Sequence, residues 1–294
     1  MSVKKITDLT ELESANSTDV VPVVDVTNKE TKKMQFDNLM ASIVPKNAGA
    51  HNSIYRGKDI TELWENGTLS KQIAAGTFDD IFIGDYITGA SGYKYMVGHI
   101  DYMYKVATSD DTRCVTHHLL MVPDHVMGTA TMNSTNITTG AYVGSELYAS
   151  GLDDVKTIIK NDIGSDHILS HYNHFANTVT GDYESAGTWY ESTIDLMNET
   201  MVYGNEQWHN IKRGANASTQ YNVQTTQLAI FRLDPSFRMV KMGLTYEAEN
   251  TGYKGWWLRD VAFAGCFCDV NWIGFANHIG ASWVGGLRPA FLIY

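Results

Sequence analysis

Three closely spaced histidines are the nearest approach to a metal-binding pattern in this sequence. His167, His171 and His174 occur in the run DHILSHYNHF, and a spacing of four would place the first two imidazoles on one face of a helix. No acidic residue or cysteine accompanies them in a recognised ligand pattern, and the neighbouring Tyr172 and Phe175 favour a strand or a loop. We therefore expect three polar or partly buried histidines and no bound metal.

Thiol chemistry would have to come from Cys114, Cys266 or Cys268. The last two form a Cys-x-Cys pair, which on a strand points both side chains to one face but closes a ring that is tight for an unstrained disulfide. An odd number of cysteines, together with an N-terminus that has no apolar signal region, argues against a disulfide framework. We expect the pair to be two small buried hydrophobic side chains.

Two further positions carry acid or base groups. His117 and His118 are adjacent in an expected strand over residues 114–122, so they would face opposite sides and could not bind one metal together. Glu199 lies in an apolar setting without a partner acid or nucleophile beside it. We therefore predict that Glu199 is a buried hydrogen-bonding residue rather than a catalyst.

The composition indicates a folded chain with a substantial core. The 294 residues are 44% hydrophobic and 19% charged, with 16 Tyr and only 5 Pro, a balance that favours β structure and long ordered loops. A net charge of −11 argues against general binding to nucleic acid or to an anionic membrane. No apolar run approaches the length of a membrane span.

The sequence divides into an N-terminal arm (residues 1–45), a linker (46–50) and a larger domain (51–294). In the arm we predict a strand over 19–25, a turn over 27–30, a returning strand over 31–36 and a short helix over 37–43. A lone hairpin with a short helix buries too little apolar area to stand alone, so the arm must pack on copies of itself or on a partner.

In the larger domain we expect an α+β fold with small antiparallel sheets, a few helices and long loops. Helices are predicted over 68–75, which Gly76 would end, and over 146–163, where apolar residues recur on one face. Strands are predicted over 77–87, within 93–106 as a pair, over 114–122, from Trp189 before a turn that ends at Gly204, and over 227–233; residues 205–222 are expected to form a loop.

The last forty residues, Gly255 to Tyr294, concentrate Trp, Phe, Gly and Ala and carry little charge. Glycine breaks the segment too often for one helix, and it does not alternate well enough for one long strand. It is either a displayed contact surface, since aromatic side chains dominate interface energetics, or the core of a small-sheet domain.

Two stretches near the N-terminus carry a family resemblance. The pattern KITDL, then DVVPVVD, then TKK resembles the N-terminal anchor of phage tail-fibre and head-fibre proteins. The stretch NSIYRGK followed by IAAGTFDDIFIGDY resembles a module of structural proteins from phages and prophages of gut Firmicutes. The resemblance implies that residues 1–45 anchor the protein to other virion proteins.

The ending is similar to that of C-type-lectin-like domains, in particular the variable proteins of diversity-generating retroelements; formylglycine-generating enzymes share the broad fold. The pieces WLRD and GGLRPAF carry this resemblance. It implies a scaffold of Trp257, Leu258, Arg259, Asn271, Gly274, Ala276, Ala281, Gly286, Arg288 and Pro289. It implies ligand contacts at Asp260, Trp272, Ile273, Phe275, Asn277, His278, Ile279, Ser282, Trp283 and Val284.

The resemblances favour a non-enzymatic virion structural protein of fibre or receptor-binding type, without a cofactor and assembled in the bacterial cytoplasm. Expected partners are further copies of itself in a homotrimer, other virion proteins, and a host cell-surface protein or glycan. The alternative is an architectural capsid-decoration or baseplate subunit whose aromatic loop packs on a neighbour. An enzyme of the formylglycine-generating type is disfavoured, because that family spaces its two cysteines further apart than Cys266 and Cys268.

Overall fold

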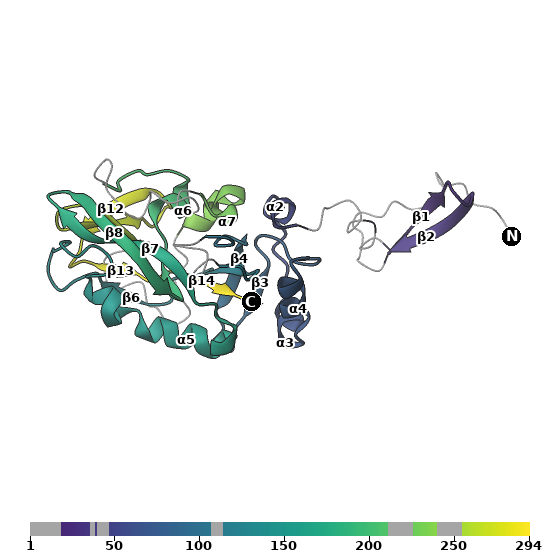
Figure 1. The fold of residues 1–294 in the computed structure, drawn as a ribbon, viewed down its shortest axis with the longest axis horizontal. Coiled ribbons are helices and arrows are strands. Elements are labelled where there is room, and N and C mark those ends of the chain that lie inside the picture. Colours follow the sequence, from purple (N-terminus) through teal and green to yellow (C-terminus); the bar gives the residue numbers. More distant parts are fainter. Residues whose placement is uncertain (1–18, 36–38, 40–46, 107–113, 211–225, 240–254) are drawn as a thin grey trace. The chain divides into compact units, whose positions relative to one another are not determined.

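The computed structural model describes six parts of the chain and divides it into two compact units, Met1–Lys46 and Asn47–Tyr294. Figure 1 shows the order of the elements along the chain. The described residues are 19–35, 39, 47–106, 114–210, 226–239 and 255–294.

The first unit contains the predicted hairpin. β1 (Val20–Asp25) pairs antiparallel with β2 (Glu30–Gln35), from Val20 opposite Gln35 to Asp25 opposite Glu30. The Asp25 carboxylate closes the turn, because it accepts the backbone amide of Asn28 and the ammonium group of Lys32 at 2.7 Å. The hydrogen bond from Lys32 is the main reason that the pKa of Asp25 falls to about 2. The helix predicted over 37–43 lies outside the described residues, apart from Leu39.

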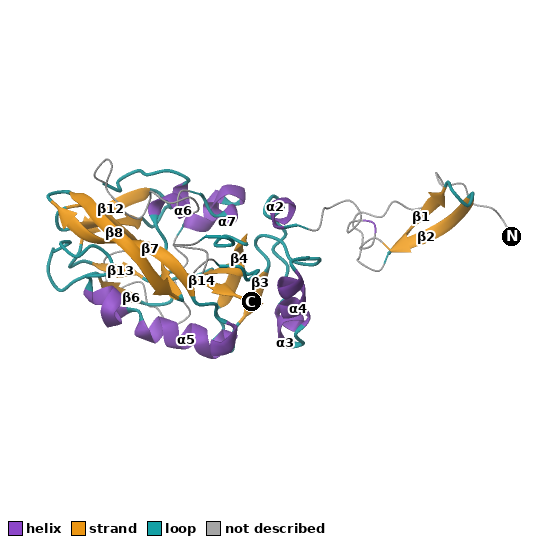
Figure 2. Cartoon of the chain, viewed as in Figure 1, coloured by secondary structure: helices purple, strands orange, loops and turns teal. Residues whose placement is uncertain are grey.

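The second unit is an α+β fold, as predicted, built on two five-stranded sheets (Figure 2). One has the order β12-β11-β10-β13-β6 and the other the order β3-β4-β5-β14-β9. Their strands pair antiparallel, except for a parallel contact between β10 and β13. The strands are β3 (Tyr86–Thr88), β4 (Lys94–Ile100), β5 (Leu119–Pro123), β6 (Thr129–Thr131), β9 (Ile194–Leu196), β10 (Trp256–Phe263), β11 (Cys266–Val270), β12 (Ala276–Gly280), β13 (Val284–Gly286) and β14 (Pro289–Ile293).

A long two-stranded ribbon and several short helices complete this unit (Figures 1 and 2). None of the described helices is long and apolar enough to cross a membrane. The ribbon is β7 (His171–Thr180) with β8 (Tyr183–Ser192). The α-helices are α2 (Ala48–His51), α3 (Thr61–Glu65), α4 (Thr68–Ala75), α5 (Asp153–Ile163), α6 (Glu199–Tyr203) and α7 (Ala229–Leu233); a π-helix covers Leu147–Gly151 and 3-10 turns cover Ser165–His167 and Pro235–Arg238.

The core lies around the chain's last segment. β10 is buried at every position except Phe263, and β5 is buried throughout. Aromatic and branched side chains suit such strands, which must pack on both faces. The two largest fully buried side chains are Trp256 and Trp257. The opening of the C-terminal segment is therefore core rather than displayed surface.

Helices with clear sequence signals are where we predicted them. α4 ends at Gly76 in the left-handed conformation that glycine favours. α5 buries Val155, Ile159 and Ile163, which recur every four residues along one face. The predicted helix over 146–163 is confirmed, although its first part is a π-helix that meets α5 at Leu152.

Several predicted strands were wrong. Of the strand predicted over 77–87, only Tyr86 and Ile87 lie in a strand, β3. Residues 77–85 form turns and loops, in which the buried Asp85 carboxylate accepts both Nε and Nη2 of Arg56 and the amides of Lys58 and Phe82. Residues 93–106 supply one strand, β4, followed by a turn, and β5 starts only at Leu119.

Two other expectations also need correction. Of the strand predicted over 227–233, residues 229–233 form the helix α7. The run is short and mostly buried, so it shows no periodicity that separates helix from strand. Residues 48–50 belong to α2 of the second unit rather than to a linker. The expected strand and turn over 189–204 are β8, β9 and the helix α6.

Candidate functional site

The two ends of the last segment, where the resemblance places a scaffold, are buried and hydrogen-bonded. Arg259 donates to the carbonyl of Leu196 at 2.8 Å. Arg288 donates to the carbonyls of Pro123 at 2.9 Å and Phe237 at 2.6 Å. Both side chains are buried, so the guanidinium groups fix neighbouring backbone instead of meeting solvent.

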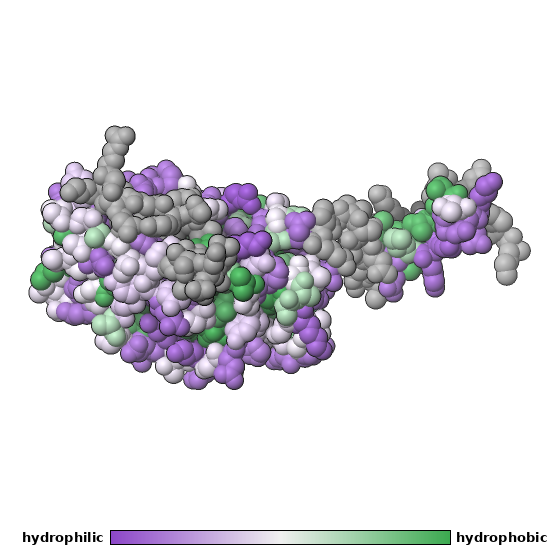
Figure 3. Space-filling model, viewed as in Figure 1, coloured by the Kyte–Doolittle hydropathy of each residue, from purple (hydrophilic) through white to green (hydrophobic). Residues whose placement is uncertain are grey.

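The interior of the last segment carries the exposed aromatic side chains. Trp272, Phe275 and Trp283 are 59%, 65% and 59% exposed, and Ile273 is 39% exposed. Single exposed apolar side chains are common, but neighbouring ones such as Trp272 and Ile273 can mark a contact surface. On the face drawn in Figure 3, hydrophilic and hydrophobic residues are mixed over the coloured surface of this unit.

The exposed aromatics form two groups rather than one. Trp272, Ile273 and Phe275 lie in the turn between β11 and β12, which we call the 271–275 turn. Trp283 follows the other end of β12. Five strand residues span roughly 16 Å, so one small ligand could not touch both groups.

The other predicted contact residues lie between or beside these groups. Asn277 donates to Asp269, Ile279 packs against the core, and His278 lies with its ring 4.5 Å from that of Phe263. Ser282 donates to Asn136. Val284, at the start of β13, is half-buried.

Asp260 is the exception among the predicted contacts. Its side chain is fully buried, so its expected place on the displayed surface was wrong. It lies on β10, beneath a segment from a distant part of the chain.

That segment, residues 205–210, lies over the sheet and extends the aromatic surface. The indole Nε1 of Trp208 donates to the carbonyl of Ala276 at 3.2 Å, and its ring meets His278 edge-on at 4.5 Å. Asn210 donates to the carbonyl of Val261 on β10 at 3.0 Å. Trp208 is itself 43% exposed.

A hollow of about 350 Å³ opens between this segment and the 271–275 turn. Its walls are aromatic side chains, two amides and one guanidinium group. The hydroxyl of Tyr203 donates to the carbonyl of Gly274 at 3.1 Å and joins the two sides. The lining residues are Tyr203, Asn205, Gln207, Trp208, Arg238, Phe275 and Ala276.

β12, at the edge of its sheet, forms part of the same surface. In an antiparallel pair every second residue turns its N–H and C=O away from the partner strand, and here these residues are Ala276, His278 and Gly280. The carbonyl of Ala276 accepts the indole of Trp208, and that of Gly280 accepts the amide of Trp283. Two of the three outward carbonyls are therefore used within the chain.

Glu199 holds the 205–210 segment from below, as a buried hydrogen-bonding residue, which confirms its predicted role. The side chain is fully buried and its carboxylate accepts the amides of Gln207 at 2.6 Å, Trp208 at 2.9 Å and His209 at 2.9 Å. Backbone N–H groups that converge on a carboxylate form strong, charge-assisted hydrogen bonds with it.

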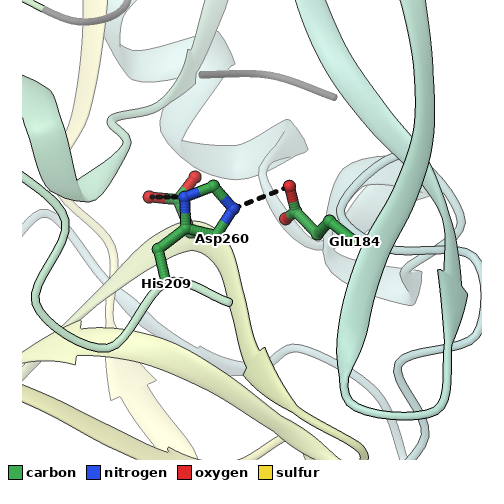
Figure 4. A group of neighbouring side chains, drawn as sticks. All are labelled: Glu184, His209 and Asp260. Atoms are coloured by element: carbon green, nitrogen blue, oxygen red, sulfur yellow. Dashed lines mark hydrogen bonds and ion pairs between the residues drawn. The ribbon is translucent and has the colours of Figure 1, made fainter. Parts of the chain in front are cut away.

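His209 joins this segment to both neighbouring sheet elements. Figure 4 shows its imidazole lying between two carboxylates. Nε2 is 2.8 Å from Glu184 of β8, and Nδ1 is 4.0 Å from Asp260 of β10. Burial alone would lower the pKa of His209, but Asp260 and Glu184 outweigh it and raise that pKa to about 10. Burial also raises the pKa of Asp260, to about 6.

The arrangement fits a charged imidazolium better than a metal chelate. The ligand atoms of Glu184, His209 and Asp260 lie within 4.8 Å of one another. A metal held by these three residues would bind one ring nitrogen, and both carboxylates would then have to lie near that same nitrogen. Here each carboxylate faces a different nitrogen, so the ring bridges them.

The three spaced histidines do not come together as ligands. His167 lies edge-on to Trp64, His171 is within 3.0 Å of the amide of Asn173, and His174 lies edge-on to Trp189. Burial lowers the pKa of both His171 and His174 to about 4, so both are neutral at physiological pH.

The cysteines are free and unsuited to nucleophilic chemistry. Cys268 is fully buried, and that burial raises the pKa of its thiol well above the usual range. Cys266 is half-buried with a pKa that burial also raises. The thiolate is the reactive form, so both groups are held in the unreactive one.

Sequence reasoning missed the 205–210 segment, Tyr203 and Arg238. The one local signal was Trp208, an aromatic residue inside the polar run NEQWHN. Tyr203 comes just before this segment and Arg238 from a later part of the chain, and nothing in their local sequence predicts that they line one hollow with Phe275.

No family model, curated protein or solved structure matches this chain.

Proposed function

We propose that the protein is a virion structural protein of fibre or receptor-binding type. Its second unit, a C-type-lectin-like domain, displays a surface for attachment to a host cell. The first unit joins it to other virion proteins and to copies of itself in a homotrimer. The ligand is a cell-surface protein or glycan.

The observation that carries this proposal is the contrast within the last segment. Trp257, Arg259 and Arg288 are buried and hydrogen-bonded, whereas Trp272 and Phe275 are exposed on a turn between them. A rigid scaffold that presents aromatic side chains loses little side-chain entropy when it binds. Such anchors supply most of the energy of an interface.

Binding to intact cells of gut Firmicutes strains tests the proposal. Labelled full-length protein is compared with the double variant Trp272→Ala, Phe275→Ala and with the control Tyr294→Ala, an exposed aromatic residue on β14's side of the unit. The double variant should lose at least about tenfold in affinity, since each buried aromatic contributes about 1–3 kcal/mol. Equal binding of all three proteins to every strain that binds would contradict the proposal.

An architectural decoration or baseplate subunit is the alternative, and the same side chains distinguish it. Oxidative footprinting of the assembled particle should label Trp272, Phe275 and Trp283 if they face the host. Protection of all three in the particle, with labelling in the isolated protein, would favour the architectural role.

A further inference from the structure

The cation that lines the hollow has no anionic partner in the described part of the chain. Arg238 places its guanidinium carbon 5.0 Å from the ring centre of Tyr203 and donates one N–H to the carbonyl of Phe231 at 3.2 Å. Its Nε is buried without a hydrogen-bond partner. In a chain with a net charge of −11, a half-buried arginine without a carboxylate stands out.

The rest of the lining complements a small polar ring. Trp208 and Phe275 are exposed aromatic side chains, whose negative faces attract the polarised C–H groups of a saturated ring. Asn205 and Gln207 bring amide groups that both donate and accept hydrogen bonds, as hydroxyl groups require. About 350 Å³ is the size of a site for one such ring.

We propose that the hollow binds one residue of an acidic saccharide, with its carboxylate on Arg238 and its ring against Trp208 or Phe275. This deepens the proposed function, on which it rests, by naming the ligand class. A guanidinium group matches a carboxylate in a two-pronged geometry. A phosphorylated ligand fits less well, because a single cation lines the hollow.

The buried carboxylates nearby do not oppose this assignment. Glu199 is occupied by three backbone amides, and neither it nor Asp269 lines the hollow. Both side chains are fully buried, so the group that a ligand meets is Arg238.

Calorimetry on the full-length protein tests the proposal with three acidic probes: methyl glucuronide, methyl galacturonide and N-acetylneuraminic acid. Methyl glucoside and the methyl ester of methyl glucuronide are the neutral comparisons. At least one acid should bind about tenfold or more tightly than the neutral sugars, and Arg238→Gln should abolish that preference. Lys71→Gln, which removes one exposed positive charge on α4, should retain it.

Two further variants keep the test decisive if Arg238→Gln is poorly folded. Arg238→Lys retains the charge and should keep a reduced preference for the acid. Asn205→Ala should weaken the binding of acidic and neutral sugars alike.

Equal binding of acidic and neutral sugars, or no binding of any of the three acids, would overturn the assignment. If binding to cells requires Phe275 but is not inhibited by excess acidic sugar, the saccharide assignment is wrong and the proposed function is unaffected.

Discussion

Glu199 shows how a single buried carboxylate can shape an exposed surface. It does not line the hollow, yet it accepts three consecutive amides of the segment that carries Gln207 and Trp208. Because those amides would otherwise be buried without partners, the carboxylate decides where the segment lies. The position of the Trp208 ring therefore depends on a residue that lies beneath it.

Replacing Glu199 by Gln should lower the free energy of unfolding by about 2–4 kcal/mol. The glutamine side chain has only one acceptor oxygen, and its NH2 group would face the backbone N–H groups that the carboxylate now accepts. Urea unfolding measures this loss. Glu65→Gln, at an exposed position on α3, should change the value by less than about 0.5 kcal/mol. Similar stabilities for the two variants would show that Glu199 is not needed to hold the segment.

The imidazole of His209 should titrate far above the usual histidine range. Its folded pKa of about 10 exceeds the ordinary value near 6.5, because Asp260 and Glu184 favour the charged ring. The stability that it contributes is therefore fully present below about pH 6.5 and is lost as the pH rises through about 10. NMR titration of the imidazole protons measures this directly, with His171 and His174 as internal controls that stay neutral down to about pH 4. A midpoint for His209 near 6.5 would contradict the charged arrangement.

At the scale of the element, the backbone of the 271–275 turn is shaped by two residues, Asn271 and Gly274, that are not among its exposed side chains. The side-chain oxygen of Asn271 accepts the amides of Ile273 at 3.1 Å and Phe275 at 3.0 Å. Gly274 has a φ of +87°, which most residues with a side chain avoid. These two fix the backbone, so Trp272, Ile273 and Phe275 are free to point outward.

Gly274→Ala should destabilise the protein more than a matched change elsewhere. An added Cβ would lie 3.2 Å from Cβ of Arg238, so the substitution combines backbone strain with displacement of the arginine that lines the hollow. We expect a loss of about 1–3 kcal/mol in thermal or urea unfolding. Gly181→Ala is the control, since its φ is +63° but nothing lies within 4 Å of its added Cβ. A loss no larger than that of Gly181→Ala would show that Arg238 moves freely.

Elements with local signals could be predicted from the sequence. The turn at Asp25, the four-residue recurrence of Val155, Ile159 and Ile163, and the glycine that ends α4 are each read within a few residues. The run that contains α7 was read as a strand, because such a short, mostly apolar stretch shows no periodicity that separates helix from strand.

The candidate site was only partly predictable, because most of it depends on contacts between distant residues. The composition of the last segment left its exposure open, and only the resemblance implied that Trp272 and Phe275 lie at the surface, where the structure places them. Asp260, in contrast, accepts the amide of Glu199, 61 residues away, and this contact buries a residue that the resemblance placed at the surface. Arg238 reaches the hollow only through the packing of Tyr203 and Phe231.

At the scale of the whole molecule, the described hairpin of the first unit leaves apolar side chains exposed. Val20, Val24 and Val26 are 53%, 68% and 82% exposed. A two-stranded hairpin is marginal in water without further packing. Association with other copies would cover these valines.

Light scattering should therefore find the full-length protein as an oligomer, with a trimer expected, and a variant consisting of residues 47–294 as a monomer. Val20→Ser with Val24→Ser should weaken association, while Lys33→Ser, on β2, should leave it intact. A stable monomer at full length, well above micromolar concentration, would count against the proposed fibre assembly.

The edge of β12 affects whether neighbouring copies of this chain can pair through their sheets. On a particle that carries many copies, an open strand edge would act as a template along which neighbours zip into a continuous sheet. The indole of Trp208 and the amide of Trp283 already occupy two of the outward carbonyls of β12, which leaves no unbroken row for a foreign strand. Trp208, through its indole, and Trp283, through its backbone amide, would thus hinder pairing between the β12 edges of neighbouring copies.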